Sequence, residues 1–323
     1  MTDELLSITN LQTSFFGDTG EIKAVDGVNL SIKKGQTIGI VGESGCGKSV
    51  TSLSVMSLFQ GTSGRIVNGS IKFEGRELVG LNESEMQELR GNEIAMIFQE
   101  PMTSLNPVMR VGRQIEESIR LHMGLTNKKS HERAVEMLNV VGIPRPSEIY
   151  HDYPHQLSGG MRQRVMIAIA MSCNPKLLIA DEPTTALDVT IQAQILAIMR
   201  GLRKTHDMAI MLITHDLAVV AQMCEWVLVM YSGRVVEQGN VYQIFDTPHH
   251  PYTRGLYNSV PKMDRTEKRL NSIEGVVPNP QDLPNGCKFA PRCPTSKERC
   301  LEKEPDYHKV GDDHYCRCWQ YLQ

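Results

Sequence analysis

The stretch Gly42-Glu43-Ser44-Gly45-Cys46-Gly47-Lys48-Ser49 decides the fold of this chain, and it directly follows the apolar run Thr37 to Val41. A strand that passes through glycines into a helix turns backbone N–H groups and the helix N-terminus toward a phosphate. Lys48 then supplies a positive charge to the β- and γ-phosphates, and Ser49 offers a hydroxyl to Mg²⁺. The stretch predicts a P-loop nucleotide site, the alternative being a glycine-rich turn. The predicted nucleotide contacts are Gly42, Ser44, Gly45, Cys46, Gly47, Lys48, Ser49 and Val50.

Short apolar runs bounded by glycine or polar residues predict the strands of a mostly parallel, buried sheet. They are Thr37 to Val41, Ile94 to Phe98, Leu177 to Ala180, Ala209 to Thr214 and Trp226 to Tyr231. Stretches with helical spacing fall between them, among them Gly160 to Cys173 and Val189 to Thr205. This alternation is expected of an α/β core. Ser232-Gly233 predicts a hairpin turn before a strand from Arg234 to Gln238.

One of these runs ends abruptly in two carboxylates, Asp181 and Glu182. Charge at the end of a buried strand is costly unless cations or waters meet it. We therefore predict that Asp181 supports Mg²⁺ and that Glu182 orients and polarises an attacking water, the alternative being a strand end with solvated acids. Gln99 and His215 also follow predicted strands, where Gln99 would reach metal and water and His215 the γ-phosphate.

A second anion site is predicted at Ser158-Gly159-Gly160, which opens a helix and is followed by Met161-Arg162-Gln163. The first N–H groups of a helix and its dipole attract negative charge. The alternative is an ordinary helix cap. A nucleotide held by the P-loop needs no second phosphate site in the same chain.

In this order, the P-loop, Gln99, the segment L-S-G-G-M-R-Q-R at 157–164, the acidic pair and His215 resemble the ATP-binding subunits of ABC transporters. The resemblance implies a P-loop ABC ATPase domain. Its parts would be a mostly parallel core sheet, an antiparallel β subdomain and a helical signature subdomain at about residues 106–170. Gln99 would be the Q-loop residue, also a Mg²⁺ ligand with Ser49 and Asp181, and His215 would be the switch histidine.

The same resemblance implies a dimer in which Ser158, Gly159 and Gly160 grip the γ-phosphate of ATP held by the opposite subunit. ATP would then close the dimer and hydrolysis would open it. Asp188 matches the loop that carries signals between two such domains. Phe15 stands where the family has an aromatic residue under adenine, and Phe16 is the alternative.

Two further segments resemble one branch of the family, the ATPase subunits of oligopeptide, dipeptide and nickel importers. They are I-F-Q-E-P-M-T-S-L-N-P at 97–107 and H-H-P-Y-T-R at 249–254. The resemblance covers essentially the whole chain and implies import of peptides. The implied partners are a second ATPase subunit, commonly a different paralogue, two transmembrane permease subunits and an extracytoplasmic peptide-binding protein. Nickel or another small solute is the alternative cargo, and a soluble ABC ATPase acting on nucleic acid is the alternative of another class.

Composition limits the function classes. At 323 residues with 41% hydrophobic content, the chain has room for one large α/β domain and a small appendage. A net charge of -3 gives no basic field, so we expect no nucleic-acid partner. The chain shows neither an apolar run of membrane-spanning length nor a basic start like that of a secretory signal. We expect it at the cytoplasmic face of the cell membrane.

The segment from about Pro261 differs from the rest, and we predict domains at 1–260 and 261–323. Prolines interrupt the small irregular extension, and five of the eight cysteines lie in it. Cys287, Cys293 and Cys300 are spaced C-x5-C-x6-C, followed by Cys316 or Cys318. In a cytoplasmic chain this indicates a soft-metal or iron–sulfur site rather than disulfides. Related dipeptide-importer subunits carry a [4Fe-4S] cluster in such a tail. That resemblance points to Cys318 as fourth ligand through H-x-x-x-C, with Cys316 as extra thiol; zinc or free buried thiols are the alternatives.

Overall fold

The computed structural model describes residues 3–18, 20–99, 104–185, 188–259 and 273–322. These form two compact units, one made mainly of Gly80–Leu212 and the other mainly of Leu6–Ser31, Thr37–Val79 and Ile213–Gln323. We call them the helical unit and the P-loop unit. The predicted boundary at 260 and 261 lies outside the described residues. So do 100–103, in the segment at 97–107 that suggested peptide importers, and 186–187, just before Asp188.

The helical unit contains three strands in the order β8-β7-β6. They are β6 (Ile94–Ile97), β7 (Leu177–Asp181) and β8 (Ala209–Ile213). β6 and β7 run parallel, and every residue of β7 and β8 is buried, as near-continuous apolar runs require. The three predicted strands are therefore confirmed to within one residue at their ends.

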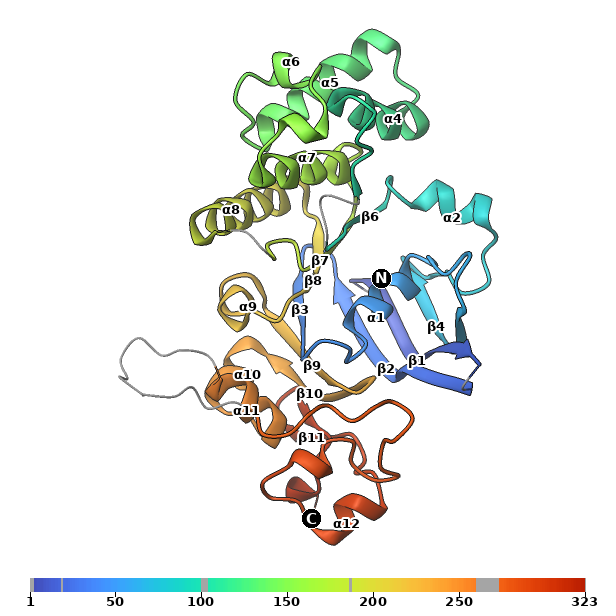
Figure 1. Cartoon of the computed structure of the whole chain (residues 1–323), viewed down its shortest axis with the longest axis vertical. Coiled ribbons are helices and arrows are strands. Elements are labelled where there is room, and N and C mark those ends of the chain that lie inside the picture. The colour runs from blue at the N-terminus through green and yellow to red at the C-terminus, as the bar shows by residue number, and fades with distance from the viewer. Residues whose placement is uncertain (1–2, 19, 100–103, 186–187, 260–272, 323) are drawn as a thin grey trace. The chain divides into compact units, whose positions relative to one another are not determined.

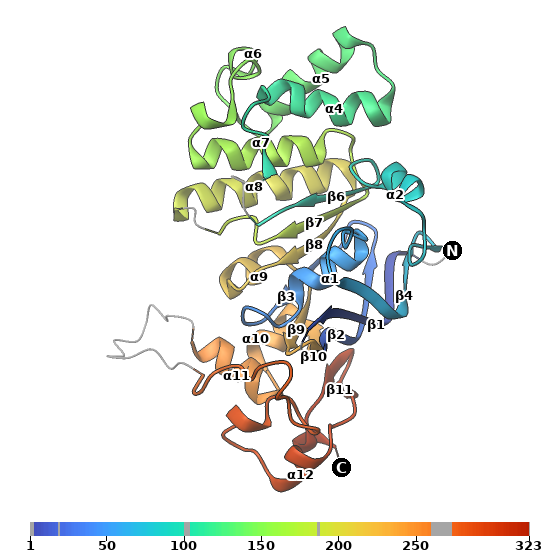
Figure 2. The ribbon, with the colours of Figure 1, turned by 45° about the vertical axis from the view of Figure 1, so that its right-hand side comes forward.

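Helices fill the rest of this unit. They are α2 (Glu83–Leu89), α4 (Val111–Met123), α5 (Asn127–Val140), α6 (Pro146–Ile149), α7 (Gly159–Met171) and α8 (Val189–His206). α5 packs against both α4 and α7, as Figures 1 and 2 show. A buried carboxylate, Glu116, fixes α4, because it accepts hydrogen bonds from Arg120 of the same helix and from the Tyr150 hydroxyl. With α4 to α7, the helical subdomain that the resemblance implied is present.

The P-loop unit contains two groups of strands. The first has the order β2-β1-β4-β5, in which β4 pairs antiparallel with β1 and β5, and forms the β subdomain that the resemblance implied. Its strands are β1 (Glu4–Gly17), β2 (Gly20–Lys33), β4 (Gly64–Phe73) and β5 (Arg76–Glu77). Thr13 of β1 shares a buried hydrogen bond with Ser54 in α1 (Lys48–Val55), which joins this subdomain to the helix after the P-loop.

The second group has the order β11-β12-β10-β9-β3. β3 (Thr37–Val41) and β9 (Trp226–Tyr231) are parallel, whereas β9 and β10 (Arg234–Asn240) form the predicted hairpin, with Ser232 and Gly233 at φ 45° and 80°. Positive φ at both central residues suits the twist of a two-residue hairpin turn. Helices α9 (Leu217–Met223), α10 (Val241–Asp246) and α11 (Pro251–Asn258) complete this part.

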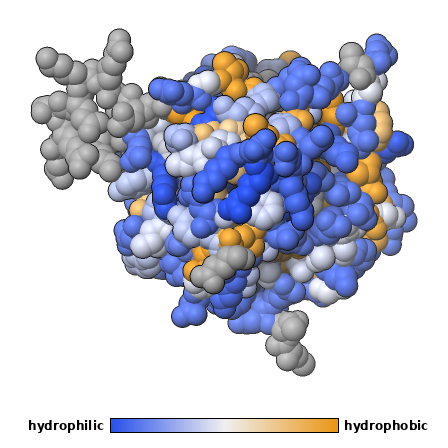
Figure 3. Space-filling view, turned by 90° about the horizontal axis from the view of Figure 1, so that it is seen from below, coloured by the Kyte–Doolittle hydropathy of each residue, from blue (hydrophilic) through white to orange (hydrophobic). Residues whose placement is uncertain are grey.

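The C-terminal extension is irregular over much of its length, as predicted. Its short elements are η2 (Ala290–Arg292), α12 (Glu298–Glu302), β11 (His308–Gly311), β12 (His314–Cys316) and η3 (Trp319–Tyr321). The sequence patterns did not predict that β12 pairs with β10, with Glu237 opposite Cys316. The face viewed in Figure 3 is mostly hydrophilic, and its hydrophobic residues form small separate groups. No helix within the described ranges combines the length and apolar character needed to cross a membrane.

Candidate functional site

The P-loop runs from the end of β3 to the first residue of α1, Lys48. Two of its glycines are required by close backbone contacts. A Cβ on Gly42 would lie 2.3 Å from the Met230 carbonyl oxygen, and one on Gly47 would lie 2.4 Å from the Ala24 carbonyl oxygen. Both residues also have positive φ, a region that favours glycine. The loop can follow this path only with glycine at these two positions.

Lys48 is buried within the loop, where its Nζ donates to the carbonyl oxygens of Gly42 at 2.8 Å and Glu43 at 3.1 Å. The contact of this ammonium group with the β- and γ-phosphates stays a prediction. The Cys46 thiol is buried too, and burial raises its pKa, so it stays protonated. Ser44 and Gly45 are exposed, whereas Ser49 and Val50 are half-buried on α1.

Two other predicted residues belong to the P-loop unit. His215 follows β8, and its neighbour Thr214 donates a backbone hydrogen bond to Ile40 of β3 at 3.3 Å, which brings the histidine loop beside the strand that leads into the P-loop. Phe15 is half-buried and packs edge-on against Phe59, with ring centroids 6.2 Å apart. Arg65 lies over the ring of Phe16 instead. Which phenylalanine faces adenine stays a prediction.

The helical unit brings Gln99 and the acidic pair together. Asp181 is buried at the end of β7, and Glu182 follows with φ 48°, a backbone conformation that is uncommon for a non-glycine residue. The Glu182 Oε2 atom accepts hydrogen bonds from Gln99 Nε2 at 3.1 Å and from Thr185 Oγ1 at 2.9 Å. The carboxylate is therefore oriented from two sides.

The predicted anion site also lies in this unit. Ser158 caps α7, and its Oγ accepts from the Met161 N–H at 3.3 Å. Gly159 borders open space, whereas a Cβ on Gly160 would lie 3.0 Å from Cγ2 of Ile191 in α8. The side chain of Asp188 caps α8 by accepting from the Ile191 N–H. Asp188 thus has a local structural role besides the signalling role that we predicted.

A hydrogen bond joins the anion-site helix to the acidic pair. Gln163 of α7 is buried and donates from Nε2 to the Pro183 carbonyl oxygen, directly after Glu182. Within this unit, Gln99, Glu182 and the helix that begins at Gly159 are therefore parts of one hydrogen-bonded assembly. How it meets Lys48 or the partner's nucleotide stays a prediction.

Four of the five C-terminal cysteines line one small pocket: Cys287, Cys293, Cys300 and Cys318. The Cys287 N–H donates to the Cys300 carbonyl oxygen at 2.7 Å, which brings two of them together. Burial raises the pKa of Cys287 to about 12. Cys316 is fully buried in β12 and does not line the pocket.

The free volume of this cysteine pocket and the spacing of its sulfur atoms favour different occupants. Its free volume of about 20 Å³ would admit a single ion, and a four-iron cluster only after the thiols rotate outward. A tetrahedral zinc ion with Zn–S bonds of about 2.3 Å would hold its sulfurs about 3.8 Å apart. Among the described residues, the only group of three or more potential ligands within 4.8 Å of one another is Glu237, His249 and His314, not the cysteines. In every set of three pocket thiols, at least two sulfurs therefore lie more than 4.8 Å apart, which is wider than the spacing in a tetrahedral zinc site.

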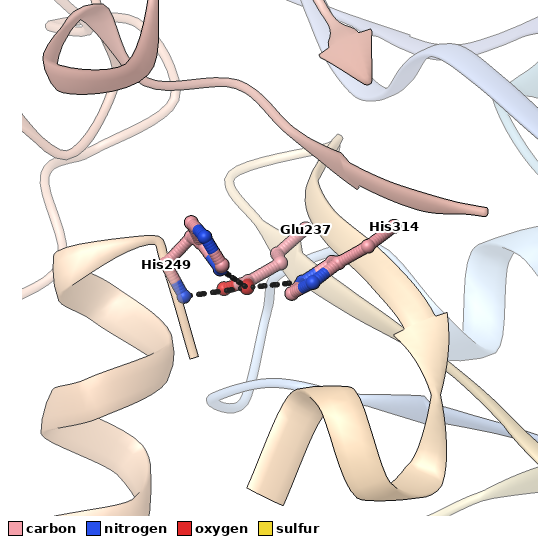
Figure 4. Close-up of side chains that lie close together, drawn as sticks. All are labelled: Glu237, His249 and His314. Carbon is pink, nitrogen blue, oxygen red and sulfur yellow. Dashed lines mark hydrogen bonds and ion pairs between the residues drawn. The ribbon is translucent and has the colours of Figure 1, made fainter. Parts of the chain in front are cut away.

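Glu237, His249 and His314 point toward one another, as Figure 4 shows. Glu237 is fully buried and accepts from His314 Nε2 at 2.8 Å and from the backbone N–H groups of His249 and His250 at 2.7 and 2.8 Å. Burial alone would raise the pKa of Glu237, but these hydrogen bonds outweigh it and lower the pKa. His249 Nδ1 lies 2.8 Å from the Thr247 carbonyl oxygen and so carries a proton. Through the bond from His314, the trio anchors β12.

Sequence reasoning missed two residues that contact the P-loop, Arg292 and Tyr252. Arg292 pairs with the Glu43 carboxylate, and the Tyr252 hydroxyl accepts a hydrogen bond from the Glu43 N–H. Tyr252 lies within H-H-P-Y-T-R, one of the segments that carry the family resemblance, and Arg292 lies between two of the pocket cysteines. No local pattern indicates that either residue reaches the loop.

Comparisons with known proteins agree with this architecture. The family model described as "ABC transporter" matches residues 25–185, and that described as "Oligopeptide/dipeptide transporter, C-terminal region" matches residues 236–300. The oligopeptide transport ATP-binding protein AppD of Bacillus subtilis is 53% identical over 98% of this chain and 97% of its own length. The dipeptide transport ATP-binding protein DppD of Escherichia coli is 49% identical over 97% of this chain and 96% of its own.

Solved structures show the same fold over the larger part of the chain. A dimeric, post-hydrolysis ATP-binding cassette, MJ0796 bound to ADP and Pi, has a TM-score of 0.67 and 26% identity, covering 73% of this chain and 99% of its own. The cbiO1 protein of Clostridium perfringens, part of the ABC transporter complex cbiONQ, has a TM-score of 0.64 and 27% identity, covering 76% and 92%.

Proposed function

We propose a function from the premise that this chain belongs to the ATP-binding proteins of oligopeptide and dipeptide ABC transporters. It hydrolyses ATP and thereby powers the import of di- or oligopeptides through a membrane complex. The observation that carries the proposal is the Glu182 carboxylate, held by Gln99 and Thr185 directly after a buried strand, in a chain whose relatives are named as peptide-transport ATP-binding proteins.

The proposed chemistry is in-line attack of water on the γ-phosphate. Glu182 accepts a hydrogen bond from that water and orients it, while Lys48 stabilises charge on the β- and γ-phosphates. Ser49, Asp181 and Gln99 would hold Mg²⁺, which neutralises phosphate charge when bound. His215 would contact the γ-phosphate, and Phe15 or Phe16 would stack on adenine.

The proposed assembly is a dimer of ATPase subunits attached to two transmembrane permease subunits, served by an extracytoplasmic peptide-binding protein. Ser158, Gly159 and Gly160 would contact the γ-phosphate bound by the second subunit, commonly a different paralogue. The dimeric cassette among the solved structures supports this arrangement. The chain would then work at the cytoplasmic face of the cell membrane as a peripheral subunit, without a nucleic-acid partner.

We also propose that Cys287, Cys293, Cys300 and Cys318 hold a [4Fe-4S] cluster, with zinc as the alternative occupant. Four thiols around one pocket and the wide sulfur spacing support the cluster. The role of such a cluster would be structural or redox sensing, because ATP hydrolysis requires no electrons. Visible absorbance together with iron and zinc analysis of protein purified without oxygen separates the two occupants.

Uptake in the native cell tests the transport function. Labelled dipeptides, longer oligopeptides and nickel ions are compared between cells with the intact gene and cells with Lys48→Ala at the same locus. Loss of peptide uptake alone is the expected result. Loss of nickel uptake alone would replace peptides by nickel as the cargo, and unchanged uptake of every cargo would overturn the transport function.

A further inference from the structure

The C-terminal extension contacts the P-loop through a partly buried ion pair. Arg292 Nη1 and Nη2 donate to the two carboxylate oxygens of Glu43 at 2.6 and 3.1 Å. The side chain of Arg292 is only 4% exposed and that of Glu43 is 28% exposed. A bidentate, shielded pair of this kind is stronger and better oriented than a surface ion pair.

The backbone of the same P-loop residue is held by a second contact. The Glu43 N–H donates to the Tyr252 hydroxyl at 2.8 Å. Tyr252 is fully buried and packs against Phe289, with ring centroids 5.3 Å apart. Glu43 is therefore fixed at both its backbone and its carboxylate by residues of the chain's C-terminal part.

The position of Arg292 depends on the segment between Cys287 and Cys293. Arg292 ends η2, which lies within this segment, and its Nε donates to the Glu274 carbonyl oxygen at 3.1 Å. Both cysteines that flank the segment line the cysteine pocket. Because Arg292 is the direct neighbour of Cys293, a shift of the backbone at that cysteine also shifts the residue that carries the guanidinium.

The contact bears on nucleotide binding because of the negative charge of Glu43. Glu43 places a negative charge in the loop where a triphosphate binds, and like charges repel. Arg292 neutralises that charge and keeps the carboxylate turned toward the extension. Loss of the guanidinium would leave an unpaired carboxylate in the loop.

From these contacts, and resting on the proposed ATP site, we propose that Arg292 is a positioning residue of the nucleotide site. It neutralises Glu43 and so links the state of the cysteine pocket to ATP affinity. The extension then controls nucleotide binding in its own subunit.

The first experiment measures the Kd for ATP of the full-length chain, with Mg²⁺ present, and of its variants. Arg292→Ala should weaken binding about tenfold, the usual scale for loss of a charge-assisted hydrogen-bonded pair. Glu43→Gln removes the charge that needs a partner and should therefore weaken binding less than Arg292→Ala does. The double variant Arg292→Ala/Glu43→Gln should recover most of the lost affinity.

Recovery of ATP affinity in the double variant shows that Arg292 acts by neutralising the charge of Glu43. If Arg292 only supported the fold, Glu43→Gln would not restore the affinity. Arg292→Lys keeps the charge without the bidentate geometry, so its Kd for ATP should lie between those of the unaltered chain and of Arg292→Ala. Lys309→Ala is the matched control, because Lys309 is half exposed, pairs with Asp313 in the same extension and does not line the cysteine pocket, so the Kd should stay unchanged. An unaltered Kd in Arg292→Ala, or a double variant as weak as the single one, would overturn the role of Arg292.

The second experiment tests the link to the cysteine pocket. Cys300→Ser removes one pocket thiol without touching Arg292, and Cys173→Ser removes a buried thiol of the helical unit as control. Cys300→Ser should weaken ATP binding severalfold in the unaltered background and much less in the Glu43→Gln background. Equal effects in both backgrounds, or none, would reject the link. An unaltered chain that fails to bind ATP at all would refute the proposed function itself.

Discussion

The amide of Gln99 donates a hydrogen bond of 3.1 Å to the carboxylate of Glu182, across 83 residues of sequence. Two strand ends produce this contact, because β6 and β7 are parallel neighbours and Gln99 and Glu182 follow their carboxyl ends. The contact orients the carboxylate that we propose to position water. It also makes the two residues testable as a pair.

Replacement of Glu182 should separate binding from turnover. We expect Glu182→Gln to keep ATP affinity and to lose at least about 100-fold in the rate of hydrolysis, because the amide cannot accept a proton from water. ATP-dependent closed dimers should accumulate. Single-turnover hydrolysis and size-exclusion chromatography measure the two effects, and hydrolysis at the normal rate would refute the assignment of Glu182.

Replacement of Lys48 should act on binding itself. Its ammonium is held by two carbonyl oxygens of the P-loop, at the N-terminus of α1. Lys48→Ala should weaken the Kd for ATP by about tenfold or more, since it removes a charged hydrogen-bond donor from the phosphates. Lys176→Ala is the control, because Lys176 is half exposed and pairs with Glu93 instead. Equal ATP affinities in the two variants would contradict the role of Lys48.

Loss of the Glu237 anchor should destabilise the C-terminal part. Glu237→Ala leaves the donors of His249, His250 and His314 without their buried acceptor, at a cost of about 3–5 kcal/mol in the free energy of unfolding. Urea denaturation monitored by tryptophan fluorescence measures this, because Trp319 lies in the extension. The exposed Glu298 provides the control variant Glu298→Ala, which should change the free energy by less than about 0.5 kcal/mol.

The two final cysteines should differ in metal binding. Cys318 lines the cysteine pocket, whereas Cys316 is buried in β12 opposite Glu237. Cys318→Ser should lower the bound metal per chain severalfold, and Cys316→Ser should retain it, since a serine hydroxyl replaces a thiolate poorly toward soft metals. Metal analysis after anaerobic purification measures the metal bound per chain in each variant. Metal loss in Cys316→Ser alone would make Cys316, and not Cys318, the fourth ligand.

Local patterns could predict much of the candidate site, because its groups follow the ends of apolar strands. Lys48 follows β3 through a glycine loop, and Glu182 follows β7 directly. In each case the strand, its end and the functional group lie within about a dozen residues, so periodicity and turn chemistry are sufficient. The roles of these residues stay predictions, but the elements that carry them are where the patterns indicated.

The sequence by itself determined the P-loop α/β character of the chain, its buried strands and the order of its nucleotide motifs, because each depends on neighbouring residues. Only the tertiary structure decided that Arg292 meets Glu43, 249 residues away, and that β12 pairs with β10. The structure also places Cys318, which the family resemblance had pointed to, and not Cys316 in the lining of the pocket. Contacts between distant segments depend on how strands pair and side chains pack, and no local spacing records them.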